Sequence, residues 1–302
     1  APGSVAATDG SSGGDWNHVR VTSATVTGGT VYYVYRSTSA TGSYIYIGNT
    51  ANPAAGVDDL TTSLNPPSYA TEYYYKVKAY GTNQFSVDSS SDTGHLQNPP
   101  MINIYASDGS SAVAPVSPNP DSTVRISWST VTYANQYDVY SSHNSYSTPI
   151  ATVSAPTTFY DDTSLTQLSE GGVQYGYKVV SRTTALTNST GNVASTTADT
   201  GYLRLYHCTG VNATDALAAT PKTNIDLTWV AVANATGYTL YRDDPPYSGT
   251  YSTLVGTFAT NSGTDTPPSD GVQYYYKVVA TNALGANANS SQTASTFDTG
   301  YL

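Results

Sequence analysis

One tripeptide recurs three times, at a nearly regular interval, along this chain of 302 residues. Asp-Thr-Gly occupies residues 92–94, 199–201 and 298–300, and each copy is followed by His or Tyr and then Leu. The sequence upstream of each copy repeats as well, so one module of roughly a hundred residues is used three times. We therefore predict three modules, at residues 1–97, 98–203 and 204–302.

Within the second module, apolar and polar residues alternate over short runs, which is the period of a half-buried β-strand. Residues 124–128 place Val124, Ile126 and Trp128 on one face, and residues 136–140 and 173–182 alternate in the same way. Turn-forming Asp and Gly residues separate the runs. Seven or so strands in each module predict an all-β chain of two-sheet sandwiches.

The third module repeats these positions, and the first departs from them once. Trp229 stands where Trp128 stands, whereas the first module has Ser23 at that position. Removing a buried tryptophan from a packed core costs about 3–5 kcal/mol. Another side chain must fill the space, and Trp16 is expected to do so.

Three runs of the second module resemble the fibronectin type III family, in the form found as tandem repeats in bacterial secreted and surface proteins. They are Val-Arg-Ile-Ser-Trp at 124–128, Tyr-Asp-Val-Tyr at 137–140 and Tyr-Gly-Tyr-Lys-Val at 175–179. The resemblance covers essentially the whole chain. It implies immunoglobulin-like sandwiches with adhesive, spacer or structural roles and no catalytic residues. Three such sandwiches in line, with short junctions between them, predict a rod.

The resemblance also implies a structural tyrosine at the start of the sixth strand of each module. In the family this tyrosine locks the preceding corner by hydrogen bonding to backbone. The predicted structural core therefore comprises Trp128, Trp229, Tyr73, Tyr175 and Tyr274.

Charge and cysteine content narrow the classes of partner and compartment. The net charge is −10 and the eleven Lys and Arg residues are scattered, which argues against nucleic acid. No apolar run has the length of a membrane span, so no membrane insertion is expected. Cys208 is the single cysteine, which excludes an intrachain disulfide and fits a bacterial extracellular or cell-surface protein. The start at Ala1 leaves open a removed signal peptide or a segment of a longer array.

No motif in the chain predicts catalysis, a cofactor or a metal. Asp-Thr-Gly also marks aspartic proteases, but here each copy ends a module, where turn chemistry is the simpler interpretation. The four histidines lack metal-binding spacing. The acid pairs Asp58-Asp59 and Asp161-Asp162 lack the spacing of an EF-hand and leave weak calcium binding open. We expect a protein that is not an enzyme.

Strand alternation directs a second set of tyrosines outward. The third and sixth strands should be neighbours, so Tyr33, Tyr35 and Tyr74 are expected to cluster on one exposed face of the first module. Exposed tyrosines offer a large and rigid contact area, although a solvated sheet face with high β-propensity is an open alternative. The predicted contact patch comprises Tyr33, Tyr35, Tyr74, Tyr140, Tyr241 and Tyr275.

Four Asn-x-Ser/Thr sequons give a prediction of glycosylation. They begin at Asn188, Asn212, Asn234 and Asn289. The Ser/Thr-rich surface is a second candidate for glycan attachment.

Two functions fit these observations. The first is a non-enzymatic structural repeat protein of an extracellular bacterial surface fibre or filament. Its partner would be another copy of itself, with glycans as a further partner, and a heterologous end-to-end contact would propagate the filament. The alternative is a spacer or carbohydrate-binding segment of a larger secreted polysaccharide-degrading enzyme or adhesin. Long periodic fibres in the microscope favour the first, and isolated rods favour the second.

Overall fold

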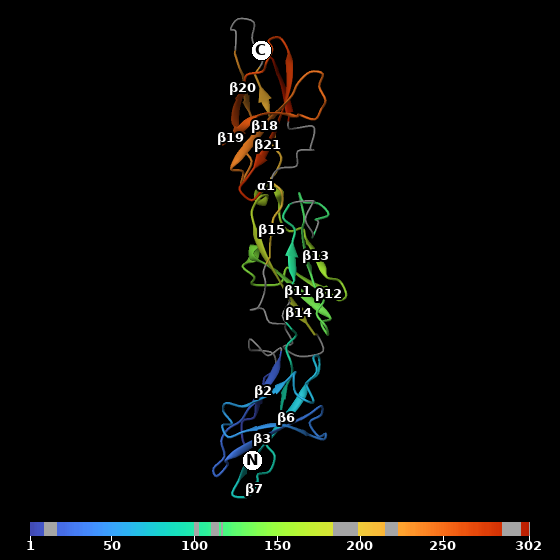
Figure 1. The fold of residues 1–302 in the computed structure, drawn as a ribbon, viewed down its shortest axis with the longest axis vertical. Helices are drawn as coiled ribbons and strands as arrows, with labels where there is room; N and C mark the ends of the chain where they lie inside the picture. The colour runs from blue at the N-terminus through green and yellow to red at the C-terminus, as the bar shows by residue number, and fades with distance from the viewer. Residues whose placement is uncertain are drawn as a thin grey trace. The chain divides into compact units, whose positions relative to one another are not determined.

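The expectation of an all-β chain is confirmed (Figure 1). This computed structural model describes residues 1–8, 17–99, 103–109, 115, 117–183, 199–214, 223–285 and 297–301, the last range as backbone alone. Among these residues, helical structure is confined to the short pieces η1 (Ser142–Asn144) and α1 (Gln167–Glu170). None of the described helices has the length and apolar character that crossing a membrane requires.

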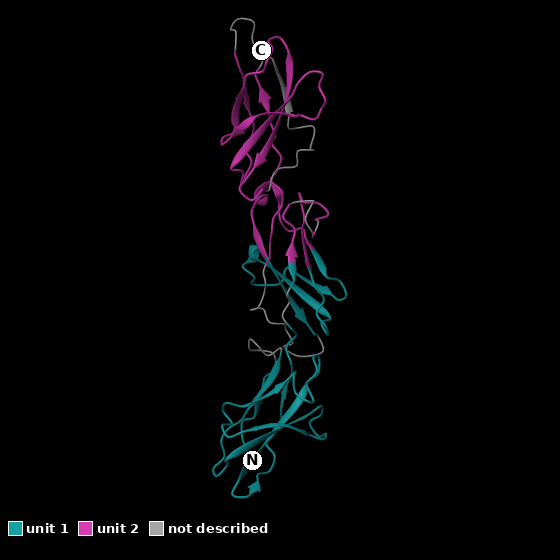
Figure 2. Cartoon of the chain, in the orientation of Figure 1, with its two compact units in different colours: residues 1–104, 128–160, 177–198 teal, residues 105–127, 161–176, 199–302 magenta. Residues whose placement is uncertain are grey.

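The chain divides into two compact units, which Figure 2 shows in different colours. The first comprises residues 1–104, 128–160 and 177–198, and the second comprises residues 105–127, 161–176 and 199–302. The three module ranges and the rod stay predictions.

The first module forms a small sheet and a large sheet. The small sheet has the order β1-β2-β5, and the large sheet has the order β4-β3-β6-β7 with β8 also paired to β6. The strands are β1 (Ala6–Ala7), β2 (His18–Thr22), β3 (Val31–Ser37), β4 (Ile45–Thr50), β5 (Val57–Leu60), β6 (Tyr73–Gly81), β7 (Gln84–Phe85) and β8 (Asp92–Gly94).

Strand alternation builds the core of this module. Tyr32 and Val34 on β3 and Tyr75 and Val77 on β6 are buried, together with Val19 of β2. Ser23 is buried as well, and its hydroxyl has no hydrogen-bond partner among the described residues. Trp16, the predicted filler of this space, lies outside them.

The second and third modules each have a three-stranded and a four-stranded sheet in the described residues, where the first has three and five strands. The second has the orders β13-β10-β9 and β12-β11-β14-β15, and the third has β16-β17-β20 and β19-β18-β21-β22. With β7 set aside, the strand order is the same in all three modules and confirms tandem fibronectin type III-like sandwiches. The strands of the second module are β9 (Ile104–Ala106), β10 (Val124–Trp128), β11 (Gln136–Ser141), β12 (Ala151–Ser154), β13 (Phe159–Asp162), β14 (Tyr175–Arg182) and β15 (Asp199–Gly201). Those of the third are β16 (Asn212–Ala213), β17 (Ile225–Thr228), β18 (Gly237–Asp243), β19 (Thr253–Phe258), β20 (Ser262–Asp265), β21 (Gln273–Thr281) and β22 (Phe297–Tyr301).

The recurring Asp-Thr-Gly lies in a strand, which corrects the expectation of a turn. Asp92 and Asp199 begin β8 and β15, and their Oδ2 atoms accept the backbone N–H groups of Ala7 and Ala106 at 2.9 Å. A Cβ on Gly94 would lie 2.7 Å from the carbonyl oxygen of Thr8. In the first two modules the tripeptide thus ties the last strand to the first, and glycine allows the close approach.

Candidate contact surface

Five aromatic side chains form a connected run on the outer side of the first module's large sheet. They come from β3, β4, β6 and β7, and we call them the aromatic face: Tyr35, Tyr46, Tyr33, Phe85 and Tyr80. Tyr46 and Phe85 are each 52 % exposed, and the other three are half-buried.

The rings of the aromatic face touch in sequence across the sheet. Ring centroids lie 5.9 Å apart for Tyr35–Tyr46 and for Tyr33–Tyr46, 5.2 Å for Tyr33–Phe85 and 5.0 Å for Tyr80–Phe85. Neighbouring rings are tilted by 45° to 71° to one another. These distances and angles are those that aromatic pairs prefer, and each such pair contributes about 0.5–1.5 kcal/mol beyond the area it buries.

The register of the strands explains why these rings meet. Tyr35 lies opposite Tyr46 in the β3–β4 pair, and a bulge between Val34 and Tyr35 shifts the pairing there. Tyr80 lies opposite Phe85 in the β6–β7 pair. Side chains that lie opposite each other on paired strands point to the same face of the sheet. The tight turn between β6 and β7 therefore places the Phe85 ring beside Tyr80 on the outer face.

Two lysines lie beside the aromatic face. The Nζ of Lys78 lies 5.8 Å from the centre of the Tyr35 ring and 3.2 Å from the Asp88 carboxylate. The Nζ of Lys76 lies 4.4 Å from the centre of the Tyr44 ring. The latter pair recurs as Lys178 with Tyr146 at 4.3 Å and as Lys277 with Tyr251 at 5.7 Å. This cation–π pair is common to all three modules, whereas the Lys78 contact is not.

The structure brings together part of the predicted contact patch. Tyr33 and Tyr35 meet through Tyr46, but Tyr74 lies opposite Ser37 and Thr93 and has no ring contact among the described residues. Tyr46, Phe85 and Tyr80 were missed. The alternation of residues 44–47 and the Thr82-Asn83 turn before Phe85 are the sequence signals that could have found the first two.

The remaining patch residues lie in different surroundings. Tyr140 is half-buried beside Asp138, whose carboxylate accepts from Arg182 at 3.1 Å, and burial followed by the Asp138 charge raises the pKa of Tyr140. Tyr241 lies opposite Leu254, and the ring of Tyr275 contacts that of Tyr247 at 4.9 Å.

A buried polar cluster lies beneath the sheet in the first module. The Arg36 guanidinium bonds the Asp59 carboxylate at 2.7 Å, and the Tyr75 hydroxyl donates to the same oxygen at 2.9 Å. Burial raises the pKa of Asp59, and the bonds from Arg36 and Tyr75 offset this only in part. Burial also raises the pKa of Tyr75, and the neighbouring Asp59 raises it further.

The third module contains the same cluster. Arg242 bonds Asp265 at 2.7 Å, and the Tyr276 hydroxyl donates to Asp265 at 2.8 Å. In the second module Ser141 stands at the position of these arginines, and Asp162 accepts from the backbone and hydroxyl of Ser164 instead.

The predicted corner tyrosines fall into two groups. Tyr73 and Tyr274 are 6 % and 1 % exposed, and their rings lie against Arg36 and Arg242. The Tyr73 hydroxyl accepts the backbone N–H of Ser68 at 3.0 Å, and the Tyr274 hydroxyl donates to the Ser269 carbonyl at 3.3 Å.

Tyr175 differs from the other two and is not a core residue. It is half-buried, and its hydroxyl donates to the Glu170 carboxylate at 3.3 Å. In the second module the helix α1 ends at Glu170 and so places this carboxylate near Tyr175. The module has no arginine at the position that the Tyr73 and Tyr274 rings cover in the other two modules. Trp128 and Trp229 are 5 % and 3 % exposed, and their rings contact Tyr137 and Tyr238.

Two of the four sequon asparagines lie in the described chain. Asn212 is exposed at the start of β16. Asn234 is exposed too, but its Nδ2 donates to the carbonyls of Ser169 at 2.9 Å and Gly171 at 3.1 Å. A glycan on Asn234 would have to displace one of these bonds. Asn188 and Asn289 lie outside the described residues.

The adjacent carboxylates Asp58 and Asp59 bind different arginines. Asp58 forms a two-bond ion pair with Arg20 at 2.7 Å, which lowers its pKa, while Asp59 belongs to the buried cluster. Arg125 and Asp161 repeat the outer pair in the second module. Within the described parts of the chain, no group of three or more His, Cys, Asp or Glu side chains could hold a metal ion.

The chain is similar in fold to several solved fibronectin type III structures. The FN1–FN3 domains of chicken CNTN1 match at 14 % identity, covering 98 % of this chain and 97 % of that one, with a TM-score of 0.34. A two-domain fibronectin type III segment of chicken tenascin matches at 15 % identity, 67 % and 98 % coverage and a TM-score of 0.36. A Fn3-like protein from Clostridium thermocellum matches at 24 % identity, 34 % and 95 % coverage and a TM-score of 0.26.

No protein-family model matches the chain, and no curated protein matches it. The assignment of the fold rests on the strand order and on the repeated core positions.

Proposed function

We propose that this tandem array of fibronectin type III-like sandwiches is a non-enzymatic structural protein of an extracellular bacterial surface fibre. Copies of the chain associate through the aromatic face of the first module. The observation that carries the proposal is the unbroken run of ring contacts from Tyr35 to Tyr80, with Tyr46 and Phe85 each 52 % exposed. Tyrosine and phenylalanine are enriched at the centres of protein interfaces, and a contiguous exposed apolar patch marks a contact site.

Charge supports a second copy of this chain as the partner. The chain carries a net charge of −10, whereas Lys76 places a positive charge beside the aromatic face; the charge of Lys78 is paired with Asp88. A positive charge on an acidic protein favours approach of another acidic surface and sets its orientation.

The shape of the aromatic face favours a protein partner over a sugar. Its rings are tilted by 45° to 71° to their neighbours, so they form ridges rather than the flat platform on which a sugar ring stacks. The spacer or carbohydrate-binding alternative therefore comes second.

Sedimentation velocity over a concentration series, with negative-stain microscopy of the same samples, tests the proposal. The double variant Tyr46→Ser/Phe85→Ser should weaken self-association at least tenfold, since truncating two central contacts costs about 2 kcal/mol or more. Leu254→Ser is the matched control, because Leu254 lies opposite Tyr241 as Tyr46 lies opposite Tyr35 and is 59 % exposed.

The control should associate like the unchanged chain. A double variant that keeps its circular dichroism spectrum and associates normally contradicts the proposal. Isolated particles of the unchanged chain at every concentration favour the spacer alternative.

A further inference from the structure

One loop position recurs at the same end of each module with the same left-handed backbone. It lies four residues before a buried tyrosine, Tyr32, Tyr137 or Tyr238, whose hydroxyl accepts a backbone N–H six residues upstream. The three residues at this position have φ angles of +80°, +70° and +62°, and they are Gly28, Tyr133 and Asn234. We call it the tip position.

In the second and third modules the tip position contacts the module before it. The Tyr133 ring stacks on Tyr69 with centroids 5.8 Å apart and planes 25° apart. Asn234 donates to the carbonyls of Ser169 and Gly171. Tyr69 and Gly171 each lie four residues before the corner tyrosine of their module. The same pair of positions therefore meets at both internal junctions.

A second position repeats this behaviour. Thr183 and Asn282 lie eight residues after the corner tyrosine. Thr183 shares a hydrogen bond of 3.1 Å with Asn98, in the segment joining the first two modules, and Asn282 donates to the Gly172 carbonyl at 3.0 Å. Each junction is thus made by side chains from two loops at fixed positions.

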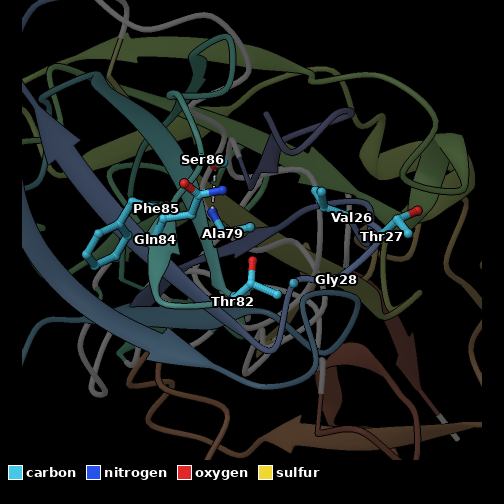
Figure 3. A pocket seen from close by; sticks show the side chains of 10 residues that line it. Val26, Thr27, Gly28, Ala79, Thr82, Gln84, Phe85 and Ser86 are labelled. Atoms are coloured by element: carbon cyan, nitrogen blue, oxygen red, sulfur yellow. Dashed lines mark hydrogen bonds between the residues drawn. The ribbon is translucent and has the colours of Figure 1, made fainter.

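At the first module both positions are glycine, and a hollow lies beside them. The residues are Gly28 and Gly81, and a Cβ on Gly81 would lie 1.8 Å from the Gly28 carbonyl oxygen. The hollow has a volume of about 140 Å³ and is lined by residues 26–29 and by residues of the stretch 79–86. Figure 3 shows Val26 and Thr27 to one side of it, Gln84 and Phe85 to the other, and Gly28 and Thr82 between them. Its lining side chains are uncharged and include hydroxyl and amide donors.

The third module presents the other half of such a junction. Asp270 lies four residues before Tyr274 and so matches Tyr69 and Gly171. Residues 268–271 are exposed, and a Cβ on Gly271 would meet open space.

We infer that the hollow beside Gly28 and Gly81 receives the loop at residues 268–271 of a second copy's third module. The inference rests on the proposed fibre and adds to it an end-to-end contact that is separate from association through the aromatic face. The paired side chains differ from junction to junction. Tyr133 meets Tyr69 at the first junction, and Asn234 meets Gly171 at the second. At the contact between copies, Gly28 has no side chain and leaves room for Asp270. Donors on Thr82 and Gln84 suit the Asp270 carboxylate, and no lining carboxylate opposes it. A contact between unlike surfaces does not close on itself and propagates a filament.

Cross-linking of the full chain tests this contact. The double variant Thr27→Cys/Ser269→Cys places one thiol at each surface, and a short bifunctional maleimide should then yield a ladder of covalent multimers. Native Cys208 is fully buried, and burial raises the pKa of its thiol to about 12, so it does not compete. Thr27→Cys/Leu64→Cys is the matched control, because Leu64 is fully exposed in the corresponding loop of the first module. A missing ladder, or an equal ladder in the control, overturns the inference.

A charge variant gives a second readout. Asp270→Ala in the cross-linking chain should lower the yield several-fold, whereas Asp226→Ala, an equal charge change on an exposed part of β17, should not. Equal yields from these two chains contradict the role of Asp270. Adding Tyr46→Ser to the cross-linking chain separates this inference from the proposed function. The ladder should persist while association through the aromatic face weakens, and loss of the ladder in that chain counts against a separate end contact.

Discussion

The first and third modules share a buried polar cluster and differ on the outer face of the large sheet. Each buries an arginine, an aspartate and a tyrosine in the same arrangement, Arg36–Asp59–Tyr75 and Arg242–Asp265–Tyr276. On the outer side of the large sheet, the two modules carry different residue types at three matching positions, two in the aromatic face and one beside it. The third module has Thr239, Leu254 and Val279 where the first has Tyr33, Tyr46 and Lys78.

This difference bears on what the outer rings are for. The buried cluster recurs in two of the three modules, as expected of side chains that stabilise the interior. If the rings served only as good strand formers, the same positions in the third module would be expected to carry rings too. Among the described positions that were compared, the third module lacks the aromatic face, which favours a contact role over a solvated sheet.

The largest expected effect comes from breaking the shared buried cluster. Arg36→Ala leaves Asp59 buried without its cation and should destabilise the first module by about 3–5 kcal/mol. Hydrogen exchange followed by mass spectrometry should show faster exchange in β3 and β6, with β18 and β21 unchanged. Arg20→Ala is the control, because Arg20 is 49 % exposed in its ion pair and should cost about 0–1 kcal/mol. Similar losses from both variants would contradict the comparison.

Alkaline pH should weaken both clusters in the same direction. The pKa values of Tyr75 and Tyr276 are raised in the folded chain, so these phenols stay neutral while their unfolded counterparts ionise near pH 10. The unfolded state then binds fewer protons, and the free energy of unfolding falls by about 1.4 kcal/mol per pH unit for each tyrosine. Exchange measured from pH 8 to 11 should show this slope, and Tyr75→Phe should reduce it in the first module only.

The third module should start to weaken at a lower pH than the first. Burial raises the pKa of Cys208 from 9.0 to about 12, so the thiol stays protonated in the folded chain while it ionises in the unfolded chain. The free energy of unfolding of the third module therefore begins to fall near pH 9. Cys208→Ala should remove the part of the slope that begins near pH 9. An unchanged slope in that variant would show that this thiol does not contribute.

The smallest expected effects come from removing the hydroxyl of each corner tyrosine, and the loss of stability should be smaller in the second module than in the other two. Tyr73→Phe and Tyr274→Phe each remove a hydrogen bond between a buried ring and backbone and should cost about 1 kcal/mol. Tyr175→Phe should cost less, because its bond to Glu170 lies at a half-exposed position. Denaturant unfolding monitored by exchange in each module measures the three values, and an equal cost at Tyr175 would argue against the distinction.

The interior could be predicted from the sequence because it repeats. The tryptophans at 128 and 229 and the tyrosines at 73 and 274 stand at matching offsets, and the alternation of two residues fixes their inward direction. Tyr175 could not be placed in this way, because its surroundings depend on α1 and on Ser141, which break the repeat.

The exterior was harder to predict for a physical reason. Contacts on the outer face depend on the register of strands that are short or bulged. The shift at Val34 and Tyr35 brings Tyr46 opposite Tyr35, and the turn at Thr82 and Asn83 returns Phe85 onto the sheet. Alternation predicts that Tyr74 faces outward, but it does not show that the residue opposite Tyr74 is Ser37, which has no ring for it to contact.

Hydroxyl-radical footprinting of dilute and concentrated protein is the sharpest test of association through the aromatic face, since it reports the solvent access of individual side chains. Labelling of Tyr33, Tyr46 and Phe85 should fall as the chain associates, while labelling of Tyr241 and Leu254 in the third module should stay constant. Constant labelling of the first three in associated protein, or an equal fall in both modules, would contradict it.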